Sequence, residues 1–248
     1  MNSFGFCYPN NIYTKYKEDF NKEDYFSFNL KYPQFSNLNN TYLPVNPSVL
    51  NNINSLIKED VYSFNNGIKE DELEFNTNLN DEDKKFFKAF TDYNTTFSKN
   101  NILSITLYLM SVSNEEGLTY NQLNNYNYDL TTGDSLLLKD IFNKGVDYLS
   151  LVSDYINYKI SLNPKLYYPD IDVNISENQA FYLTYDSIIF FFDEEQIAPE
   201  DQGIVKFKMN YNKFFPYINP RFTCIIPNFS ALPQSRASLK ANPKYFKK

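Results

Sequence analysis

The chain has 248 residues, of which 42% are hydrophobic, 18% aromatic and 21% charged, and it contains neither histidine nor tryptophan. Without histidine it cannot form a Ser-His-Asp triad, a Cys-His pair or the usual histidine-ligated catalytic zinc site. Its 30 acidic and 23 basic residues leave a net charge of -7, which argues against nucleic-acid binding because that function needs a basic surface.

The chain shows no sign of export or of a membrane anchor. Its first residues lack the basic and apolar regions of a signal peptide, and its longest apolar runs, at 102–110 and 188–192, are shorter than a membrane helix. We expect no transmembrane segment. Cys7 and Cys224 lie near opposite ends without metal-type spacing, which predicts two reduced thiols, with a disulfide between the two ends as the alternative.

The first half of the chain predicts an arm, a strand and a long helix. Residues 1–25 are aromatic and charged without regular periodicity, which indicates an arm packed on the domain. Residues 26–33 alternate between apolar and polar and end in proline, as a strand does. Asn46 and Pro47 are typical of a helix start, and apolar residues follow on one face. These are Val49, Ile53, Leu56, Ile57, Val61 and Phe64.

The middle of the chain predicts an antiparallel meander. A short helical turn at 81–85 leads into a strand that starts at Phe86. Three β-rich runs follow and are separated by turn residues at 114–117 and 131–134. The runs cover 102–110, 118–130 and 136–138.

The last third predicts a second helix and three further strands. The helix starts near Asn143 and ends at Asn163-Pro164, and its inward residues are Val146, Leu149, Val152, Ile156 and Ile160. The strands are predicted at 181–183, 187–192 and 203–209.

This order of elements predicts an α+β fold in which two small subdomains follow in tandem, each an antiparallel sheet covered by an amphipathic helix. We expect an N-terminal arm at 1–25, a first subdomain at 26–125, a second at 126–218 and a proline-containing basic tail at 219–248. The tail carries Arg236, Lys240, Lys244, Lys247 and Lys248 without an acidic residue, so the body of the protein is more acidic than the average.

Groups of carboxylates are the first candidates for chemistry, because two that face each other across a cleft can hydrolyse glycosides. Consecutive acids more often form solvated loops, and none of these groups has the spacing of a calcium loop. No phosphate-binding glycine loop or GxSxG motif exists, so we predict no catalytic residue, no metal site and no cofactor. The groups are Asp71-Glu72-Glu74, Asp81-Glu82-Asp83, Glu115-Glu116, Asp193-Glu194-Glu195 and Glu200-Asp201.

Three segments resemble a pair of uncharacterised domains that occur together in bacterial envelope proteins. Residues 126–142 read YNYDLTTGDSLLLKDIF and are similar to the junction between the two domains. Residues 181–193 read FYLTYDSIIFFFD, are followed by QIAP and Gly203, and look like a run in the second domain. Residues 31–36, KYPQFS, resemble the start of the first.

The resemblance implies an α+β binding module without enzymatic activity. The pair is found in the ectodomain of a lysozyme-sensing anti-sigma factor, beside a deacetylase domain in a peptidoglycan deacetylase, and in stand-alone proteins of spore-forming Firmicutes, Clostridia among them. We therefore expect a non-enzymatic binding or structural module at a spore surface or cell envelope, either cytoplasmic or made in the mother cell. The alternatives are a sensor-like domain that binds lysozyme or a peptidoglycan fragment, and a carboxylate-based glycosidase.

One loop is the predicted contact site for a protein or cell-wall glycan partner. Members of the family often carry a Gly-Gly-Ala-His-like segment between two strands, where this chain has residues 113–120. The loop, whose sequence differs from that of the family, places acidic, amide and aromatic side chains at a sheet end, where binding residues tend to gather. We predict that partner binding involves Asn114, Glu115, Glu116, Tyr120 and Asn121.

Overall fold

The computed structural model describes residues 7–39 and 43–223, and its strands form two sheets. The larger contains β1 (Ile12–Lys22), β2 (Phe26–Asn37), β3 (Phe87–Lys99), β4 (Ile102–Ser113) and β5 (Gly117–Asp129), in that spatial order. The smaller contains β6 (Phe181–Leu183), β7 (Ser187–Phe192) and β8 (Val205–Asn210), also in order. The helices are α1 (Pro47–Asn76), α2 (Leu138–Ile141), α3 (Tyr148–Leu162) and α4 (Tyr211–Phe214).

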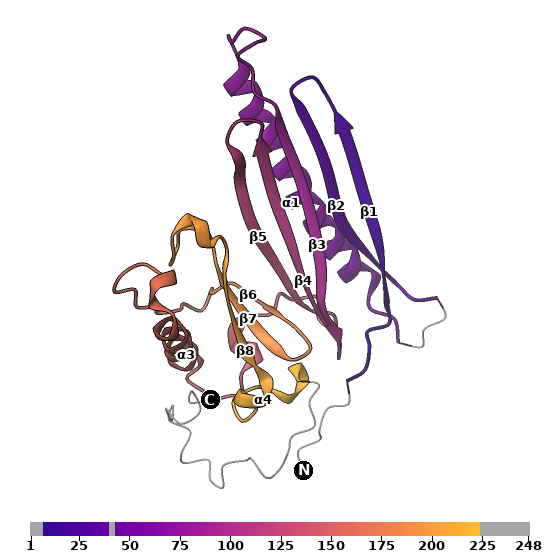
Figure 1. Cartoon of the computed structure of the whole chain (residues 1–248). Coiled ribbons are helices and arrows are strands. Elements are labelled where there is room, and N and C mark those ends of the chain that lie inside the picture. The colour runs from indigo at the N-terminus through magenta and orange to yellow at the C-terminus, as the bar shows by residue number, and fades with distance from the viewer. Residues whose placement is uncertain (1–6, 40–42, 224–248) are drawn as a thin grey trace.

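Each sheet is covered by one helix, as Figure 1 shows, and the predicted α+β class is confirmed. All strand pairs are antiparallel except β2 and β3, which are parallel over residues 26–30 and are connected through α1. The parallel pair arises because the helix carries the chain back along the sheet before β3 begins. The predicted limits of the two subdomains stay a prediction.

Helix α1 starts where the sequence predicts, because the side chain of Asn46 accepts a hydrogen bond from the amide of Ser48 at 3.0 Å and Pro47 occupies the first turn. Its apolar face packs on the sheet through Val49, Leu50, Ile53, Ile57 and Val61, together with the inward residues of β4. Leu56, predicted to lie on this face, is instead 46% exposed, because it lies at the edge of the stripe.

The N-terminal arm is in fact an edge strand. Every residue of β1, from 12 to 22, pairs with β2 in antiparallel fashion. No residue of β1 is fully buried, and Tyr13, Tyr16 and Phe20 are exposed. The half-buried positions of β1 are mostly polar, as Thr14, Lys17 and Asp19 are, so the inward apolar period that identifies a strand is missing here.

The third strand of the predicted meander is absent, and residues 136–138 lead into α2 instead. Ser135 makes a single bridge with Tyr128, and the chain then turns. The amide of Leu137 donates to the carboxylate of Asp140 at 2.9 Å, which caps the short helix. Three consecutive leucines fit a buried strand and a helix start equally well, and the cap decides between them.

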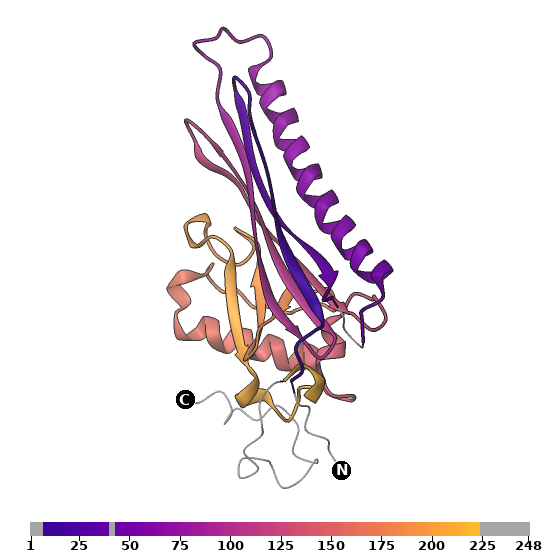
Figure 2. The ribbon, with the colours of Figure 1, turned by 90° about the vertical axis from the view of Figure 1, so that its right-hand side faces the viewer.

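The small sheet encloses the second core. Val152, Ile156 and Ile160 of α3 pack against Ile188, Phe190 and Phe192 of β7. Figure 2 shows α3 running across the base of the molecule while α1 follows the long axis of the large sheet. All three strands of the small sheet lie where the sequence predicts them.

Three further predictions concern the chain ends and membranes. Cys7 is in a disulfide bond, so the expectation of a reduced thiol at this position is wrong. Of the predicted tail at 219–248, residues 219–223 are described and Phe222 is buried in the second core, whereas Cys224 and the rest of the tail lie outside the described residues. Within the described part of the chain, no helix is long and apolar enough to cross a membrane.

Candidate functional site

The predicted partner loop lies at the tip of the β4–β5 hairpin and is held by the start of β3. The backbone amide of Asn114 donates to the carbonyl of Phe86 at 3.2 Å, and its side-chain oxygen accepts from the amide of Phe86 at 3.1 Å. Lys85 makes ion pairs with Glu115 at 3.2 Å and with Glu116 at 2.6 Å. The hydrogen bond with Glu116 raises the pKa of Lys85, so both glutamates share one firmly protonated ammonium group.

The other two predicted residues leave the loop in different directions. The ring of Tyr120 packs 5.3 Å from that of Phe64 on α1, and its hydroxyl contacts Gln122. The side-chain amide of Asn121 donates to the carboxylate of Glu194 at 2.6 Å, and Glu194 belongs to the loop between β7 and β8. The five residues therefore do not form one surface, and their contact with a partner stays a prediction.

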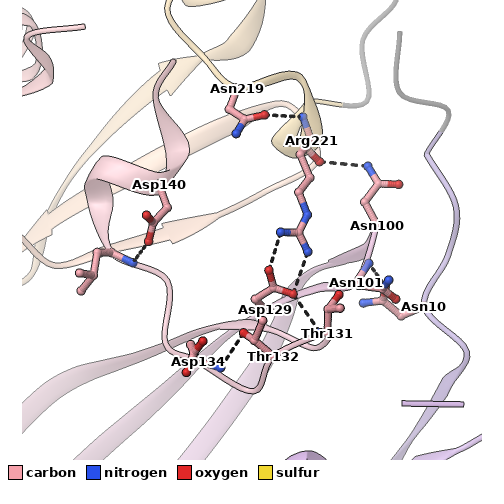
Figure 3. A network of polar contacts seen from close by, with 11 residues as sticks. Asn10, Asn100, Asn101, Asp129, Thr131, Thr132, Asp134, Asp140, Asn219 and Arg221 are labelled. Carbon is pink, nitrogen blue, oxygen red and sulfur yellow. Dashed lines mark hydrogen bonds and ion pairs between the residues drawn. The ribbon is translucent and has the colours of Figure 1, made fainter. Parts of the chain in front are cut away.

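A network of polar contacts joins the two subdomains at the end of β5, as Figure 3 shows. The guanidinium of Arg221 binds both carboxylate oxygens of Asp129, one of them at 2.8 Å. The amide of Thr131 donates to the same carboxylate at 2.9 Å. Partial burial alone would raise the pKa of Asp129, but Arg221 and the Thr131 amide outweigh that effect and lower it.

Residues from three distant segments extend this network. The carbonyl of Arg221 accepts from the side chain of Asn100 at 3.0 Å, and the side chain of Asn219 accepts from the Arg221 amide at 3.1 Å. Asn10 accepts from the amide of Asn101 at 2.8 Å, which ties the N-terminal segment to the same place. The junction motif at 126–142 thus has a structural role.

Gly133 is required in this junction. Its φ is +86°, a conformation that other residues rarely adopt, and an added Cβ would lie 2.9 Å from a methyl group of Val49 on α1. The tight turn therefore brings the start of the second subdomain against the first helix.

At the free edge of β6, buried side chains of the large sheet make the hydrogen bonds that a neighbouring strand would otherwise make. Ser104 donates to Asn127 at 2.6 Å, and the amide group of Asn127 donates to the carbonyl of Phe181 at 2.7 Å. The backbone amide of Leu183 donates to the hydroxyl of Ser104 at 3.0 Å. Because β6 is an edge strand, these contacts satisfy backbone groups that would otherwise be buried without a partner.

The groups of carboxylates singled out in the sequence form no metal site in the described part of the chain. Among the described residues, no group of three or more His, Cys, Asp or Glu side chains could hold a metal ion. Several acids of the predicted groups have other partners: Asp81 pairs with Lys84 at 2.7 Å, and Glu115 and Glu116 pair with Lys85.

Two surface grooves offer room for a ligand, and neither has a carboxylate in its lining. The smaller, of about 260 Å³, lies between α1 and β2, and Lys17, Tyr32, Asn54 and Lys58 are among the residues that line it. The larger, of about 600 Å³, lies between the C-terminal half of α3 and β8, and we call it the α3–β8 groove. Its volume falls in the usual range for ligand sites.

Aromatic side chains form the inner wall of the α3–β8 groove. Phe207 is buried, and the ring of Tyr167 stacks on it with 6.0 Å between centroids. Tyr155 packs edge-on against Phe214 at 5.1 Å, and its hydroxyl donates to the carbonyl of Lys208. Burial raises the pKa of Tyr155 to about 12, so this hydroxyl stays protonated at neutral pH.

Sequence reasoning did not identify this groove. Its parts come from α3, the segment after it, β8 and α4, and only the fold brings them together. One signal was available: Tyr155, Lys159 and Leu162 recur at helical spacing beside the buried stripe of α3.

Comparisons with known proteins agree with the architecture. Residues 20–111 match a family model described as deacetylase PdaC, and residues 139–212 match one described as a protein of unknown function, DUF3298. No curated protein matches the chain.

Two solved structures share the fold. A DUF3298-family protein from Pseudomonas aeruginosa is 13% identical with a TM-score of 0.56, and the match covers 88% of this chain and 99% of that one. A member of the same family from Bacteroides fragilis is 15% identical with a TM-score of 0.54, and the match covers 87% of this chain and 95% of that one. The chain therefore carries a PdaC-type domain and a DUF3298 domain in tandem, which confirms the domain pair that the junction motif indicated.

Proposed function

We propose that this chain is a non-enzymatic binding module that works at a bacterial cell envelope or spore surface. The observation that carries the proposal is the chemistry of the two grooves, which offer lysine, tyrosine and amide groups and no carboxylate. Such groups bind and orient a ligand, whereas glycoside hydrolysis needs a pair of carboxyl groups on either side of the scissile bond.

The spore and envelope setting is supported by resemblance and composition. The domain pair resembles the envelope proteins named above, and the 22 tyrosines fit a protein made in the mother cell for a spore surface. Fractionation of a sporulating culture tests this setting, and we expect the protein in purified spores or in the envelope fraction. Accumulation in vegetative cytosol and absence from spores would contradict it.

The absence of catalysis is tested with cell-wall material. The purified chain is incubated with acetylated peptidoglycan, and released acetate and new reducing ends are measured over several hours. We expect both to stay at the level of a heat-denatured sample. Steady release of either product by the native chain would overturn the non-enzymatic proposal, and new reducing ends would favour the glycosidase.

A second candidate is a sensor-like module that binds a peptidoglycan fragment or lysozyme, and the lysine-lined grooves favour the fragment, because its carboxylates complement them. Titration calorimetry with soluble peptidoglycan fragments and, separately, with lysozyme distinguishes the two ligands. We expect saturable heat with the fragments. Heat with lysozyme alone would favour the protein ligand over the peptidoglycan fragment.

A further inference from the structure

The geometry points to the α3–β8 groove as the binding site for an anionic glycan, that is, a saccharide that carries carboxylate or phosphate groups. This inference rests on the proposed binding function and assigns it to one site and one ligand chemistry. Neither the family models nor the similar structures assign any ligand to this groove.

The positive charge of the groove favours an anionic ligand. Four lysines line the groove and no acidic residue does, although the whole chain has a net charge of -7. Three lysines outside the groove pair with acids: Lys69 with Glu23 at 2.7 Å, Lys84 with Asp81 at 2.7 Å and Lys85 with Glu116 at 2.6 Å. A cluster of positive charge on an acidic protein attracts anions to that place.

The four lysines of the groove differ in what their ammonium groups contact. Lys208 pairs with Asp186 at 2.6 Å, and Lys206 donates to the hydroxyl of Tyr108 at 2.8 Å, so both ammonium groups are engaged on the other face of the sheet. Lys159 and Lys213 make no ion pair within the described residues. These two therefore supply the charge that a ligand would meet.

The side chains that form the wall of the α3–β8 groove suit a saccharide. The ring of Tyr167 is half-buried and is held in place by stacking on the buried Phe207, so contact with it costs little side-chain entropy. Asn163 and Asn210 add amide donors and acceptors at the rim. Flat rings suit the apolar faces of sugar rings, amides suit hydroxyl groups, and ammonium groups suit carboxylate or phosphate. An acidic peptide would also pair with the lysines, but it lacks the sugar rings that pack on aromatic side chains.

The test is a set of titrations with the full chain and four probes. Two are anionic: a glycan oligomer with N-acetylmuramic acid, which carries carboxylates, and a glycerol-phosphate oligomer substituted with N-acetylglucosamine, which carries phosphates. The controls are a neutral N-acetylglucosamine oligomer of equal length and a poly-glutamate peptide. We expect an anionic saccharide to bind about tenfold or more tightly than either control, and to weaken as salt rises. Preference for one anionic probe identifies the source of the anion.

Matched variants place the site. Lys159→Gln combined with Lys213→Gln is expected to weaken the anionic saccharide about tenfold, whereas Lys139→Gln combined with Lys144→Gln removes the same charge from exposed positions outside the groove and leaves binding unchanged. Circular dichroism checks that all variants stay folded.

The outcomes separate the two proposals. If the native chain binds an anionic saccharide and the groove variants bind it equally well, the site assignment is wrong and the binding function stands. If the neutral oligomer or the peptide binds as tightly as the anionic saccharides, the ligand chemistry is wrong. If no cell-wall material binds at all, the proposed function fails together with the site.

Discussion

The strands β1 and β7 show how differently the two sheets of this protein are stabilised. Every residue of β7 is buried, because α3 covers one face of the small sheet and the large sheet lies on the other. No residue of β1 is buried, although it is nearly twice as long. The comparison teaches that the small sheet depends on its surroundings, while β1 depends on backbone pairing with β2.

The largest expected effect tests this contrast directly. Phe190 on β7 is fully buried in the second core, so Phe190→Ala should lower the free energy of unfolding by about 3–5 kcal/mol. Phe20 on β1 is 78% exposed, so Phe20→Ala should change it by no more than about 0.5 kcal/mol. Urea unfolding of both variants measures the difference. Equal losses would show that burial does not distinguish the strands.

The next effect concerns the polar contacts that hold β6 against the large sheet. Asn127→Ala leaves the Phe181 carbonyl without its hydrogen-bond donor and removes the acceptor of the Ser104 hydroxyl hydrogen, which should cost about 1–3 kcal/mol. Asn125→Ala, on the same strand and without a side-chain hydrogen bond among the described residues, is the matched control. A Ser104→Ala variant completes a double-mutant cycle, and strict additivity of the two changes would contradict a shared network.

A smaller effect is expected at the junction, and it depends on pH. Arg221→Met should cost about 1–2 kcal/mol at neutral pH, because the Arg221 side chain is partly exposed and the pair is screened. Arg221 helps to lower the pKa of Asp129, so the stabilisation is present above the unfolded value of about 3.9 and is lost as pH falls through the lowered folded value.

Unfolding experiments between pH 7 and pH 2 measure this dependence, with Lys144→Met as an exposed control. The native chain and the Arg221→Met variant should differ most at neutral pH and converge in acid. A difference that stays constant across this range would show that Arg221 acts by packing and not through the charge of Asp129.

The smallest effect is expected at the exposed pair of Asp186 and Lys208. The hydrogen bond from Lys208 lowers the pKa of Asp186 to about 2, yet the Asp186 side chain is 57% exposed. Asp186→Asn should therefore change stability by less than about 1 kcal/mol, and 1 M salt should remove the difference. NMR titration should find the pKa of Asp186 lowered in the native chain and closer to its ordinary value in Lys208→Met. An unchanged value in that variant would contradict the assigned cause.

The parts of the fold that follow from the sequence are those with one dominant local signal. Asn46 and Pro47 mark the start of α1, and the continuous apolar run of β7 identifies a strand that is buried on both faces. The edge strand β1 could not be predicted in this way, because its half-buried positions are mostly polar and its aromatic residues are exposed. The leucines at 136–138 escape it as well, because the cap formed by Asp140 decides their conformation.

The candidate sites also divide into one that the sequence identifies and one that only the fold brings together. A loop such as 114–121 can be singled out from sequence, because it is one continuous segment between two strands. The structure shows that Lys85, Phe64 and Glu194 hold different parts of it, and none of these neighbours is close to it in sequence. The α3–β8 groove could not be predicted, because its lining comes from two stretches, 155–167 and 206–213, that only the fold brings together.

By itself the sequence determined the chemistry that this protein can use and the local elements that it forms. A chain without histidine has no imidazole base, and the caps and apolar periods identify both long helices and seven of the eight strands. Only the tertiary structure decided which charges remain unpaired. Asp129 meets Arg221 across 92 residues, whereas Lys159 and Lys213 meet no described acid, because ion pairing depends on distances in space that no local pattern encodes.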